Sequence, residues 1–211
     1  ARARNTSEKL ETIISSVQDR FISAVDRDTS RNGDSLSLPP GTNQHVSLPE
    51  LMQQIESDAR VLSSMMAGLD AVHAQDIVFD TPPDCILLGS RSELFSAVSN
   101  LVSNAVRYTP LHGKIHARWL INADQCVFAV TDTGPGIAPE HLPRLSERFY
   151  RVDRSRSRET GGTGLGLAIT KHVAQRHGGE LRIESQVGQG STFMLVLPSS
   201  RCVRADSMAQ S

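Results

Sequence analysis

The sequence has few of the features that mark membrane, secreted or nucleic-acid-binding proteins. Aromatic residues make up only 4% of its 211 residues and the formal net charge is −1, so base-stacking platforms are scarce and the overall charge does not attract nucleic acid. No apolar run approaches the ~20 residues that span a bilayer, and no signal peptide is recognisable. The first residue is Ala1 rather than methionine. We therefore expect a cytoplasmic piece of a longer protein, with no nucleic-acid partner.

Several site signatures are also missing. The three cysteines, Cys85, Cys126 and Cys202, are far apart, odd in number and without CxxC spacing, which predicts neither a disulfide framework nor a zinc site and suits a reducing compartment. None of the seven histidines belongs to an HExxH or similar motif. Two of them, His172 and His177, follow a glycine-rich turn and are interpreted as surface or packing residues. The GxxxxGK[ST] motif of P-loop proteins is absent.

Two glycine-rich turns are the most informative features present. TDTGPGI (131–137) ends a strand-like run, and GGTGLGL (161–167) leads into a helical pattern of apolar residues. Glycine lets the backbone approach a ligand closely, and a glycine turn that opens a helix presents amide N–H groups to phosphate. A Rossmann fingerprint is disfavoured because a charged loop, rather than a strand, precedes the second turn. The pair of turns indicates a nucleotide held at both ends.

Composition divides the chain into four parts. Residues 1–28 carry apolar residues at helical, near-heptad intervals, which predicts a helix that either pairs with another helix or lies on its own domain. Residues 29–44 are rich in Ser, Asn, Gly and Pro and are interpreted as a linker. Residues 45–198 form the globular domain, and residues 199–211 are expected to be a loose, flexible tail.

Within the globular domain, periodicity predicts three helices on one face of a single mixed sheet, which is a two-layer α/β sandwich. The first helix follows a short strand at His45, and the second covers SRSELFSAVSNLVSNAVRYT (90–109). The third follows the second glycine turn. Strands are expected at DIVFD, at CILLG, in the hairpin-like pair KIHARWLI and QCVFAVTD, and on both sides of a turn at residues 188–190.

The second helix carries two asparagines four residues apart. Asn100 and Asn104 share a face that differs from the apolar stripe, and Arg107 and Tyr108 continue it. Asparagine is a poor residue for the middle of a helix, so two on one face suggest a ligand for their oxygens. An amide oxygen is a suitable ligand for Mg²⁺. The alternative is two solvated surface asparagines.

The segment between the glycine turns is rich in arginine. Its arginines are Arg148, Arg151, Arg154, Arg156 and Arg158. They would neutralise phosphate charge as a mobile lid, or form a solvated loop or a nucleic-acid patch. Asp132, at the end of its strand, would accept a hydrogen bond from an exocyclic amine such as that of adenine, or simply form the turn.

Taken in order, five segments resemble the N, G1, F, G2 and G3 boxes of the sensor histidine kinases. The segments are NLVSNAVRYT, DTGPGI, ERFYRVD, GGTGLGLAI and GQGSTF. The run from Ile137 to Val173 is particularly similar to the phosphate-regulon members of that family. Residues 1–28 resemble the second helix of the family's dimerisation domain. The resemblance implies a Bergerat-type ATP-binding fold that uses ATP and Mg²⁺.

The resemblance also implies roles for individual residues. Asn104 would coordinate Mg²⁺, Asn100 would help on the phosphate side, Arg107 would lie near the phosphates and Tyr108 would border the adenine. The implied adenine pocket is Asp132, Gly134, Gly136, Ile137 and Thr192. The implied phosphate site is Gly162, Thr163, Gly164, Leu165 and Gly166. The lid would run from Phe149 to Thr160 and include Arg151.

One expected feature is missing. The family's phosphoacceptor histidine is followed by an acidic residue, and none of the histidines here has that neighbour. The fragment is therefore expected to bind Mg–ATP without phosphorylating itself. The resemblance implies an intact homodimer that is anchored in the inner membrane by preceding segments and passes phosphoryl groups from its histidine domain to a response regulator.

Other functions of the same fold remain as alternatives. ATPase clamp proteins and anti-sigma serine kinases resemble one another in having Glu at the place of Asn100, where the Glu would act as a base toward water or a hydroxyl. An asparagine cannot act as that base, which disfavours both classes. A module that binds partners without nucleotide is the third alternative.

Overall fold

The computed structural model describes residues 44–68, 74–152 and 163–204. The predicted helix over residues 1–28 and all of the predicted linker except Gln44 lie outside the described residues. Gly162, Arg154, Arg156 and Arg158 lie outside them as well. The predicted lid from residue 153 to residue 160 and the predicted tail from residue 205 to residue 211 are likewise outside the described residues.

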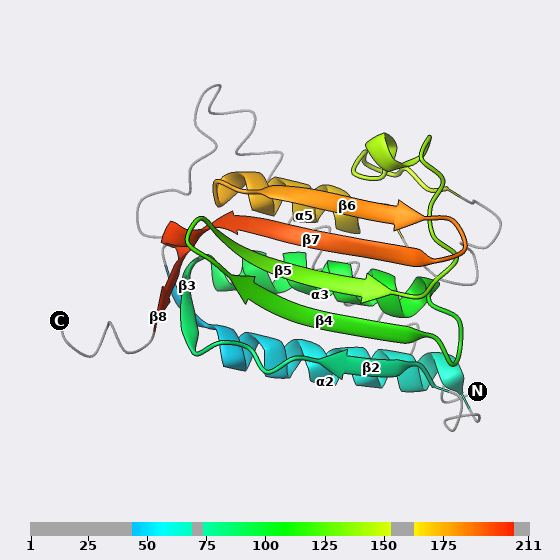
Figure 1. Ribbon diagram of the computed structural model, residues 1–211, viewed down its shortest axis with the longest axis horizontal. Coiled ribbons are helices and arrows are strands. Elements are labelled where there is room, and N and C mark those ends of the chain that lie inside the picture. Colours follow the sequence, from blue (N-terminus) through cyan, green and yellow to red (C-terminus); the bar gives the residue numbers. More distant parts are fainter. Residues whose placement is uncertain (1–43, 69–73, 153–162, 205–211) are drawn as a thin grey trace.

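The described chain contains two β-sheets (Figure 1). The strands are β1 Gln44–Ser47, β2 Asp76–Phe79, β3 Cys85–Gly89, β4 Lys114–Ile121, β5 Gln125–Asp132, β6 Glu180–Gln186, β7 Gly190–Pro198 and β8 Cys202–Arg204. The larger sheet has the order β2-β4-β5-β7-β6, and the smaller has the order β1-β3-β8. Strand β2 runs parallel to β4, and the other pairs are antiparallel. The larger sheet is therefore mixed, as the sequence predicted.

Three α-helices cover one face of the larger sheet (Figure 1). They are α2 Leu48–Ala67, α3 Arg91–Tyr108 and α5 Gly166–Arg176, and the described residues also include the 3-10 helices Leu142–Arg144 and Ser199–Arg201. Helix α2 begins where the sequence favours it, because the Ser47 hydroxyl accepts a hydrogen bond from the amide of Glu50 and Pro49 occupies the first turn. The two-layer α/β sandwich is confirmed.

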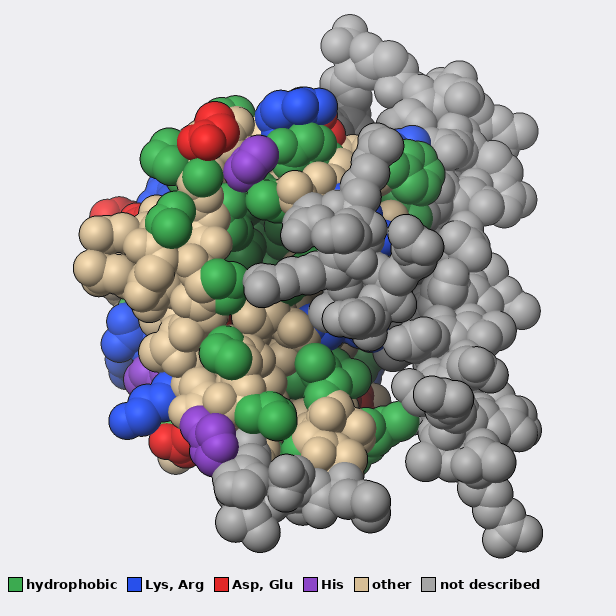
Figure 2. Space-filling view, turned by 90° about the vertical axis from the view of Figure 1, so that its right-hand side faces the viewer, with side chains coloured by type: hydrophobic (Ala, Val, Ile, Leu, Met, Phe, Trp, Pro, Cys, Tyr) green, Lys and Arg blue, Asp and Glu red, His purple; other side chains and the backbone are tan. Residues whose placement is uncertain are grey.

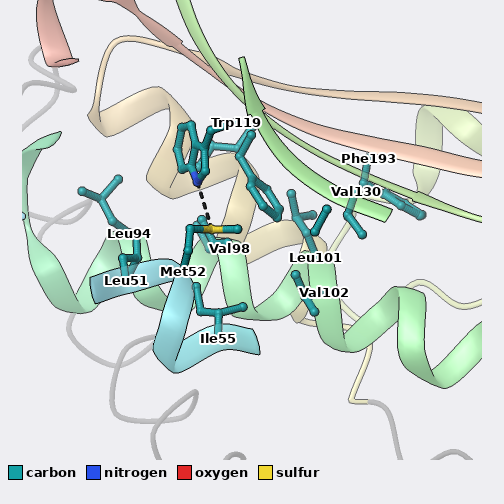
Figure 3. Packing of buried hydrophobic residues seen from close by; sticks show 14 of the residues in the cluster. Leu51, Met52, Ile55, Leu94, Val98, Leu101, Val102, Trp119, Val130 and Phe193 are labelled. Carbon is teal, nitrogen blue, oxygen red and sulfur yellow. Dashed lines mark hydrogen bonds between the residues drawn. The ribbon is translucent and has the colours of Figure 1, made fainter. Parts of the chain in front are cut away.

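The core lies between the helices and the sheet (Figure 3). Leu94, Val98 and Leu101 on α3 are fully buried, and burial of each such side chain contributes about 1.5–3 kcal/mol. The Trp119 indole N–H of β4 donates to the Met52 sulfur of α2 at 3.1 Å, so the one polar atom of this ring has a partner inside the core. The apolar stripe predicted for the second helix is thus the buried face of α3.

The smaller sheet corrects two expectations. The strand CILLG does not join the large sheet, because β3 pairs with β1 and β8 instead. Residues 199–204 were expected to belong to a loose tail, but Ser199–Arg201 forms a 3-10 helix and Cys202–Arg204 pairs with β3. The Ser199 amide also donates to the Asp124 carbonyl. The described domain therefore extends to Arg204, six residues beyond the predicted boundary at residue 198.

Candidate nucleotide-binding site

Helix α3 brings one of its asparagines against the second glycine turn. Asn100 is 7% exposed, whereas Asn104, one turn later, is half-buried. A Cβ atom added at Gly166, the first residue of α5, would lie 3.2 Å from Asn100 Oδ1. Only glycine leaves the amide undisturbed at this distance. The sequence motifs that contain Asn100 and Gly166 are therefore in contact.

Thr170 fixes the two helices at this point. Its hydroxyl donates to the carbonyl of Ala97 on α3 at 3.2 Å and to that of Gly166 at 3.0 Å, and its side chain is fully buried. Sequence analysis did not identify Thr170, since a threonine in a helix has no motif signal. It holds the first turn of α5 against α3 and thereby sets the position of the glycine turn.

Asp132 ends β5 at the edge of the sheet where the two glycine turns lie. It is 5% exposed, and its Oδ1 accepts a hydrogen bond from the Gly134 amide at 2.8 Å. Burial raises the pKa of this carboxyl, while the backbone N–H groups of Gly134 and Ser191 act in the opposite direction. A buried carboxylate with one oxygen held by the backbone has a second oxygen with which to accept a ligand's N–H.

The first glycine turn is packed tightly against the β6–β7 hairpin. Gly136 has φ of 69°, and a Cβ atom there would overlap the carbonyl oxygen of Gln186. The Gly188 amide donates to the Pro135 carbonyl at 2.8 Å. Glycine at residue 136 is thus required both by its backbone conformation and by lack of space. Two motifs about fifty residues apart form one structural unit.

Ser185 holds this unit together from the β6 side. Its hydroxyl accepts from the amide of Ile137 at 2.8 Å, donates to the carbonyl of Gly190 at 3.0 Å, and lies 2.9 Å from the Ser191 hydroxyl. Ile137 itself packs against the core. Sequence analysis missed Ser185, because a single serine in a strand pattern carries no signal of its own.

Thr192 does not lie where the resemblance implied. The register pairs Asp132 with Ser191 and Thr131 with Thr192, and paired residues share a face. The Thr192 hydroxyl lies 3.0 Å from that of exposed Thr131, on the face of the sheet away from Asp132. Ser191, which is 7% exposed, lies on the Asp132 face. Ser191 therefore replaces Thr192 among the candidate pocket residues.

The described part of the arginine-rich segment is anchored at Phe149 and Tyr150. The Phe149 amide donates to the Gly164 carbonyl at 3.0 Å, and Phe149 has φ of 63° with a side chain that is 69% exposed. The Tyr150 hydroxyl lies 2.7 Å from Nδ1 of His141, and the Arg144 guanidinium stacks over the Tyr150 ring at 4.2 Å. The Phe149 end of the predicted lid is thus bonded to Gly164 of the second glycine turn.

The end of α3 depends on a buried glutamine that sequence analysis also missed. The Gln75 side-chain amide donates to the carbonyls of Val106 and Thr109 at 2.9 and 2.7 Å, and its oxygen accepts from the Ser63 hydroxyl. These bonds satisfy carbonyls that a helix end leaves without intrahelical partners. They hold the turn that carries Arg107 and Tyr108. The Tyr108 side chain is 50% exposed, and its carbonyl lies beside Gly134.

The remaining candidates of the second turn lie before or at the start of α5. Gly164 has φ of 72°, and a Cβ there would be 3.0 Å from the Cα of Phe149. Leu165 is 5% exposed and its side chain belongs to the core, so only its backbone is available to a phosphate. Thr163 is exposed and Arg151 is half-buried. Gly162 lies outside the described residues.

The described residues provide the kinds of group that bind the parts of a nucleotide. The two glycine turns and the β6–β7 hairpin lie at one end of the large sheet (Figure 1), and Figure 2 looks onto this end, where hydrophobic side chains lie among polar surface. A buried carboxylate at one turn suits a base, and glycine amides at the start of α5 suit phosphate. An amide oxygen such as that of Asn104 suits Mg²⁺.

Comparison with known proteins agrees with this geometry. The profile of the family described as histidine kinase-, DNA gyrase B- and HSP90-like ATPases matches residues 89–201. The phosphate regulon sensor protein PhoR of Pseudomonas aeruginosa is 48% identical over 170 residues, which are 81% of this chain and 37% of that protein. PhoR of Haemophilus influenzae is 46% identical over 140 residues, which are 65% of this chain and 33% of that protein. This chain thus spans only about a third of the length of these curated relatives.

Solved structures give the same result. The mycobacterial sensor histidine kinase MprB has a TM-score of 0.61 and 28% identity, with 74% of this chain and 97% of that chain covered. No helix in the described ranges is long and apolar enough to cross a membrane. The resemblance to the catalytic domain of sensor histidine kinases, based on five sequence boxes, is confirmed. Because the family profile covers more than half of the sequence, the chain belongs to the histidine kinase-, DNA gyrase B- and HSP90-like ATPase family.

Proposed function

We propose that this chain is the ATP-binding catalytic portion of a two-component sensor histidine kinase. It would deliver the γ-phosphoryl group of Mg–ATP to a histidine on a separate dimerisation domain, from which a response regulator would take it. The observation that carries this proposal is the contact between Gly166 and Asn100, which joins the second glycine turn to the asparagine face of α3. Asp132 at the opposite turn supplies the base end of the same site.

Different residues would bind the base, the phosphates and the metal ion. Asp132 would accept the adenine amine with the oxygen that Gly134 leaves available, and Ser191 and the Gly136 turn would border the base. The amides at the start of α5, with Gly164 and Gly166, would hold the phosphates. Asn104 would ligate Mg²⁺, which supplies charge neutralisation at the phosphates. Asn100, Arg107 and Arg151 would lie on the phosphate side, while Tyr108 and Phe149 would border the site.

The asparagine side chains decide between the enzymatic alternatives. An amide cannot take a proton from water or a hydroxyl at neutral pH, so Asn100 would position and polarise groups without acting as a base. Phosphoryl transfer depends mainly on positioning and charge neutralisation, which this set of groups can provide. A histidine nucleophile that enters already neutral needs no base. These points favour transfer to histidine over the ATPase clamp and serine kinase alternatives.

Two relatives support a more specific role. Both are named as phosphate regulon sensor proteins, and one is 48% identical over 81% of this chain. We therefore propose that the whole protein acts in phosphate-starvation signalling, as a membrane-anchored homodimer with this part on the cytoplasmic side. Deletion of its gene should abolish induction of a phosphate-starvation reporter, and unchanged induction would refute this role without affecting the ATP site.

The decisive experiment separates the two halves of the reaction. The chain is mixed with γ-labelled Mg–ATP and a separately made dimerisation domain of a phosphate regulon sensor that contains its phosphoacceptor histidine. Label is expected on that domain and not on this chain. Acid-labile, base-stable label would identify phosphohistidine.

Matched variants on one helix provide the control. Asn104→Ala should reduce labelling by roughly a hundredfold, as expected for loss of a metal ligand. Ser103→Ala, at the neighbouring half-buried position, should leave it near the wild-type level. Nucleotide binding without any phosphoryl transfer would refute the proposed kinase function but would leave the proposed ATP binding standing. Absence of binding with and without Mg²⁺ would refute both.

A further inference from the structure

The fold brings together three cysteines that are widely separated in the sequence. Cys85 is on β3, Cys126 is on β5 and Cys202 is on β8. The Cys202 thiol interacts with the Cys126 thiol and also with the Cys85 thiol. The three side chains therefore form a thiol cluster where the small sheet meets the large one. Nothing in the proposed ATP chemistry uses it.

Strand register defines how the thiols face one another. Cys202 pairs with Leu87, which lies two residues from Cys85, so Cys85, Leu87 and Cys202 share one face of the small sheet. Leu87 is fully buried, which makes this the inward face. Cys126 is also fully buried and belongs to the core, and Cys202 packs against that core while remaining half-buried. Oxidants therefore have access at Cys202 but not at Cys126.

The register also selects between the two partners of Cys202. Cys85 pairs with Arg204, so Cys85 and Cys202 are diagonal neighbours on adjacent strands. The Cα atoms of diagonal neighbours are about 7–8 Å apart, beyond the ~4.4–6.8 Å that disulfides usually span between Cα atoms, although the two thiols interact. Cys126 lies on the large sheet, so the spacing of neighbours within the small sheet does not apply to it. Its interaction is also the largest of those acting on the Cys202 thiol. Cys126 is thus the favoured partner of Cys202.

The local chemistry makes Cys202 the reactive thiol. Interaction with the Cys126 thiol, followed by the weaker interaction with Cys85, lowers the pKa of Cys202 to about 7 despite its partial burial. Burial and the interaction with Cys202 raise the pKa of Cys85 to about 11, with Arg204 and Asp84 as the nearby charges. The pKa of Cys126 is raised as well. The described residues contain no cluster of His, Cys, Asp and Glu suited to a metal ion, so metal binding is not the alternative.

We propose that Cys202 and Cys126 form a peroxide-responsive thiol pair, in which Cys202 is oxidised first and Cys126 resolves it to a disulfide. The Cys202 thiolate attacks hydrogen peroxide, an S–O bond forms as the O–O bond breaks, and hydroxide leaves. The Cys126 sulfur then attacks the sulfenic acid of Cys202, an S–S bond forms as the S–O bond breaks, and the oxygen leaves as water with the Cys126 proton. Overall, two thiols and one peroxide give one disulfide and two waters.

The pair lies far from the proposed ATP site. Cys126 is near the start of β5 and Asp132 is at its end, so six residues of extended chain separate them, roughly 20 Å. The disulfide would fasten β8, and through it the small sheet, to the large sheet. Because β1 of that sheet begins the described domain at Gln44, oxidation would act on the part of the domain that the preceding chain enters. The inference does not depend on ATP binding.

Peptide mapping after oxidation tests this directly. The folded chain is treated with hydrogen peroxide, alkylated, digested without reductant and analysed by mass spectrometry. The expected product links the Cys126 and Cys202 peptides within one chain, with loss of two of the three free thiols and recovery of both after reduction. Dimedone should trap a sulfenic acid at Cys202 during the early phase.

Single variants identify the roles. Cys202→Ser should abolish the linkage and the dimedone adduct, whereas Cys85→Ser should leave the linkage unchanged. Cys126→Ala should prolong the sulfenic acid at Cys202. If the buried Cys126 variant does not fold, the wild-type map and the other two variants still decide. The proposal is overturned by a Cys85–Cys202 linkage, by linkage only between chains, or by three alkylatable thiols after peroxide treatment.

Discussion

Asn100 and Gly166 are in contact between α3 and α5, with the asparagine oxygen 3.2 Å from the point where a Cβ atom at residue 166 would stand. That distance is tighter than most side-chain contacts but does not force the backbone apart. The asparagine amide would have to shift by a few tenths of an ångström. Ligand binding should therefore respond to volume at residue 166 more strongly than folding does.

Gly166→Ala tests this contact. The variant should weaken binding of a non-hydrolysable ATP analogue by roughly tenfold, about 1.4 kcal/mol, because it displaces the Asn100 amide. Its melting temperature should stay near that of the wild type, because alanine in a helix offsets the crowding by about 1 kcal/mol. Isothermal titration and thermal unfolding measure the two effects. Equal affinity in a folded variant would contradict the assignment of Asn100 to the site.

Gly136→Ala and Gly188→Ala form a matched pair for the first glycine turn. Both glycines have positive φ, 69° and 78°, so alanine costs each about 1–2 kcal/mol in backbone strain. At residue 188 nothing lies within 4 Å of the new Cβ, whereas at residue 136 it would overlap the Gln186 carbonyl. In denaturant unfolding, the free energy of unfolding should fall at least twice as much for Gly136→Ala as for Gly188→Ala. Equal losses would mean that Gly136 is required only for its conformation.

Asp132→Asn tests the base end of the site. The carboxylate has one oxygen for the Gly134 amide and another for a ligand, whereas an asparagine has a single acceptor oxygen. Loss of a hydrogen bond to a charged group costs about 1.5–3 kcal/mol, so affinity for the ATP analogue should fall by roughly 10- to 100-fold. Asp124→Asn, before the start of β5, should leave the affinity unchanged. Wild-type affinity in Asp132→Asn would remove Asp132 from the proposed pocket.

The same variant should change the pH dependence of stability. The pKa of Asp132 is raised in the folded state from the ordinary value of 3.8, so the folded carboxyl keeps its proton to higher pH than the unfolded one. Its contribution to stability is therefore present below pH 3.8 and is lost as the pH rises through the folded-state pKa. The asparagine of this variant would not titrate. Between pH 3.8 and the folded-state pKa, the free energy of unfolding should therefore decline less with rising pH in Asp132→Asn than in the wild type.

His177 should make the domain sensitive to acid. It is fully buried; its Nδ1 lies 2.8 Å from the Val173 carbonyl and Nε2 accepts from the Ser90 amide, an arrangement that suits neutral imidazole. Burial, with smaller contributions from Arg201 and Arg176, lowers the pKa of His177 from 6.5, although Glu93 lies 3.8 Å away. Its stabilising contribution is therefore complete above pH 6.5 and declines as the pH falls toward the folded-state pKa.

Thermal unfolding at pH 7.5 and pH 5.5 measures this effect. His177→Gln cannot titrate, so the difference in melting temperature between the two pH values should be smaller for the variant than for the wild type. His116→Gln is the control, because its pair with Asp80 is exposed. If the wild type and His177→Gln lose the same stability on acidification, His177 is not the group responsible.

Gln75→Ala should loosen the end of α3. The change removes the donors for the Val106 and Thr109 carbonyls inside the protein and should cost about 1–3 kcal/mol. Gln53→Ala, at an exposed position of α2, should change stability by less than about 0.5 kcal/mol. Hydrogen exchange should be faster near Thr109 in Gln75→Ala only. Unchanged exchange there would show that α3 does not depend on Gln75.

Local pattern predicted most of the elements. Strand β4 alternates over most of its length, β5 contains the apolar run CVFAV, and α3 has a continuous apolar stripe, so all three were recognisable without tertiary information. Strand β8 was not, because three residues are too few to show a period. The motifs predicted where the candidate site lies. Successive residues of a strand point to opposite faces of the sheet, however, so the strand pairing decides which residue of the GQGSTF motif faces the pocket. That is why Ser191, and not Thr192, lies on the face of Asp132.

Residues whose roles arise from long-range contacts could not be predicted. Gln75, Ser185 and Thr170 are single polar residues whose partners lie far along the chain or in another element, and their neighbours in sequence give no sign of them. The cysteines are a similar case. Their spacing includes no CxxC motif, and it could not show that the small sheet brings Cys202 to Cys126.

The hydrogen bond from the Gly188 amide to the Pro135 carbonyl has a consequence for variation among related proteins. A change of length or sequence in the surface hairpin between β6 and β7 would shift the turn that follows Asp132, although no hairpin side chain need touch the base. Preference among purine nucleotides could therefore drift through substitutions that look neutral in a sequence alignment.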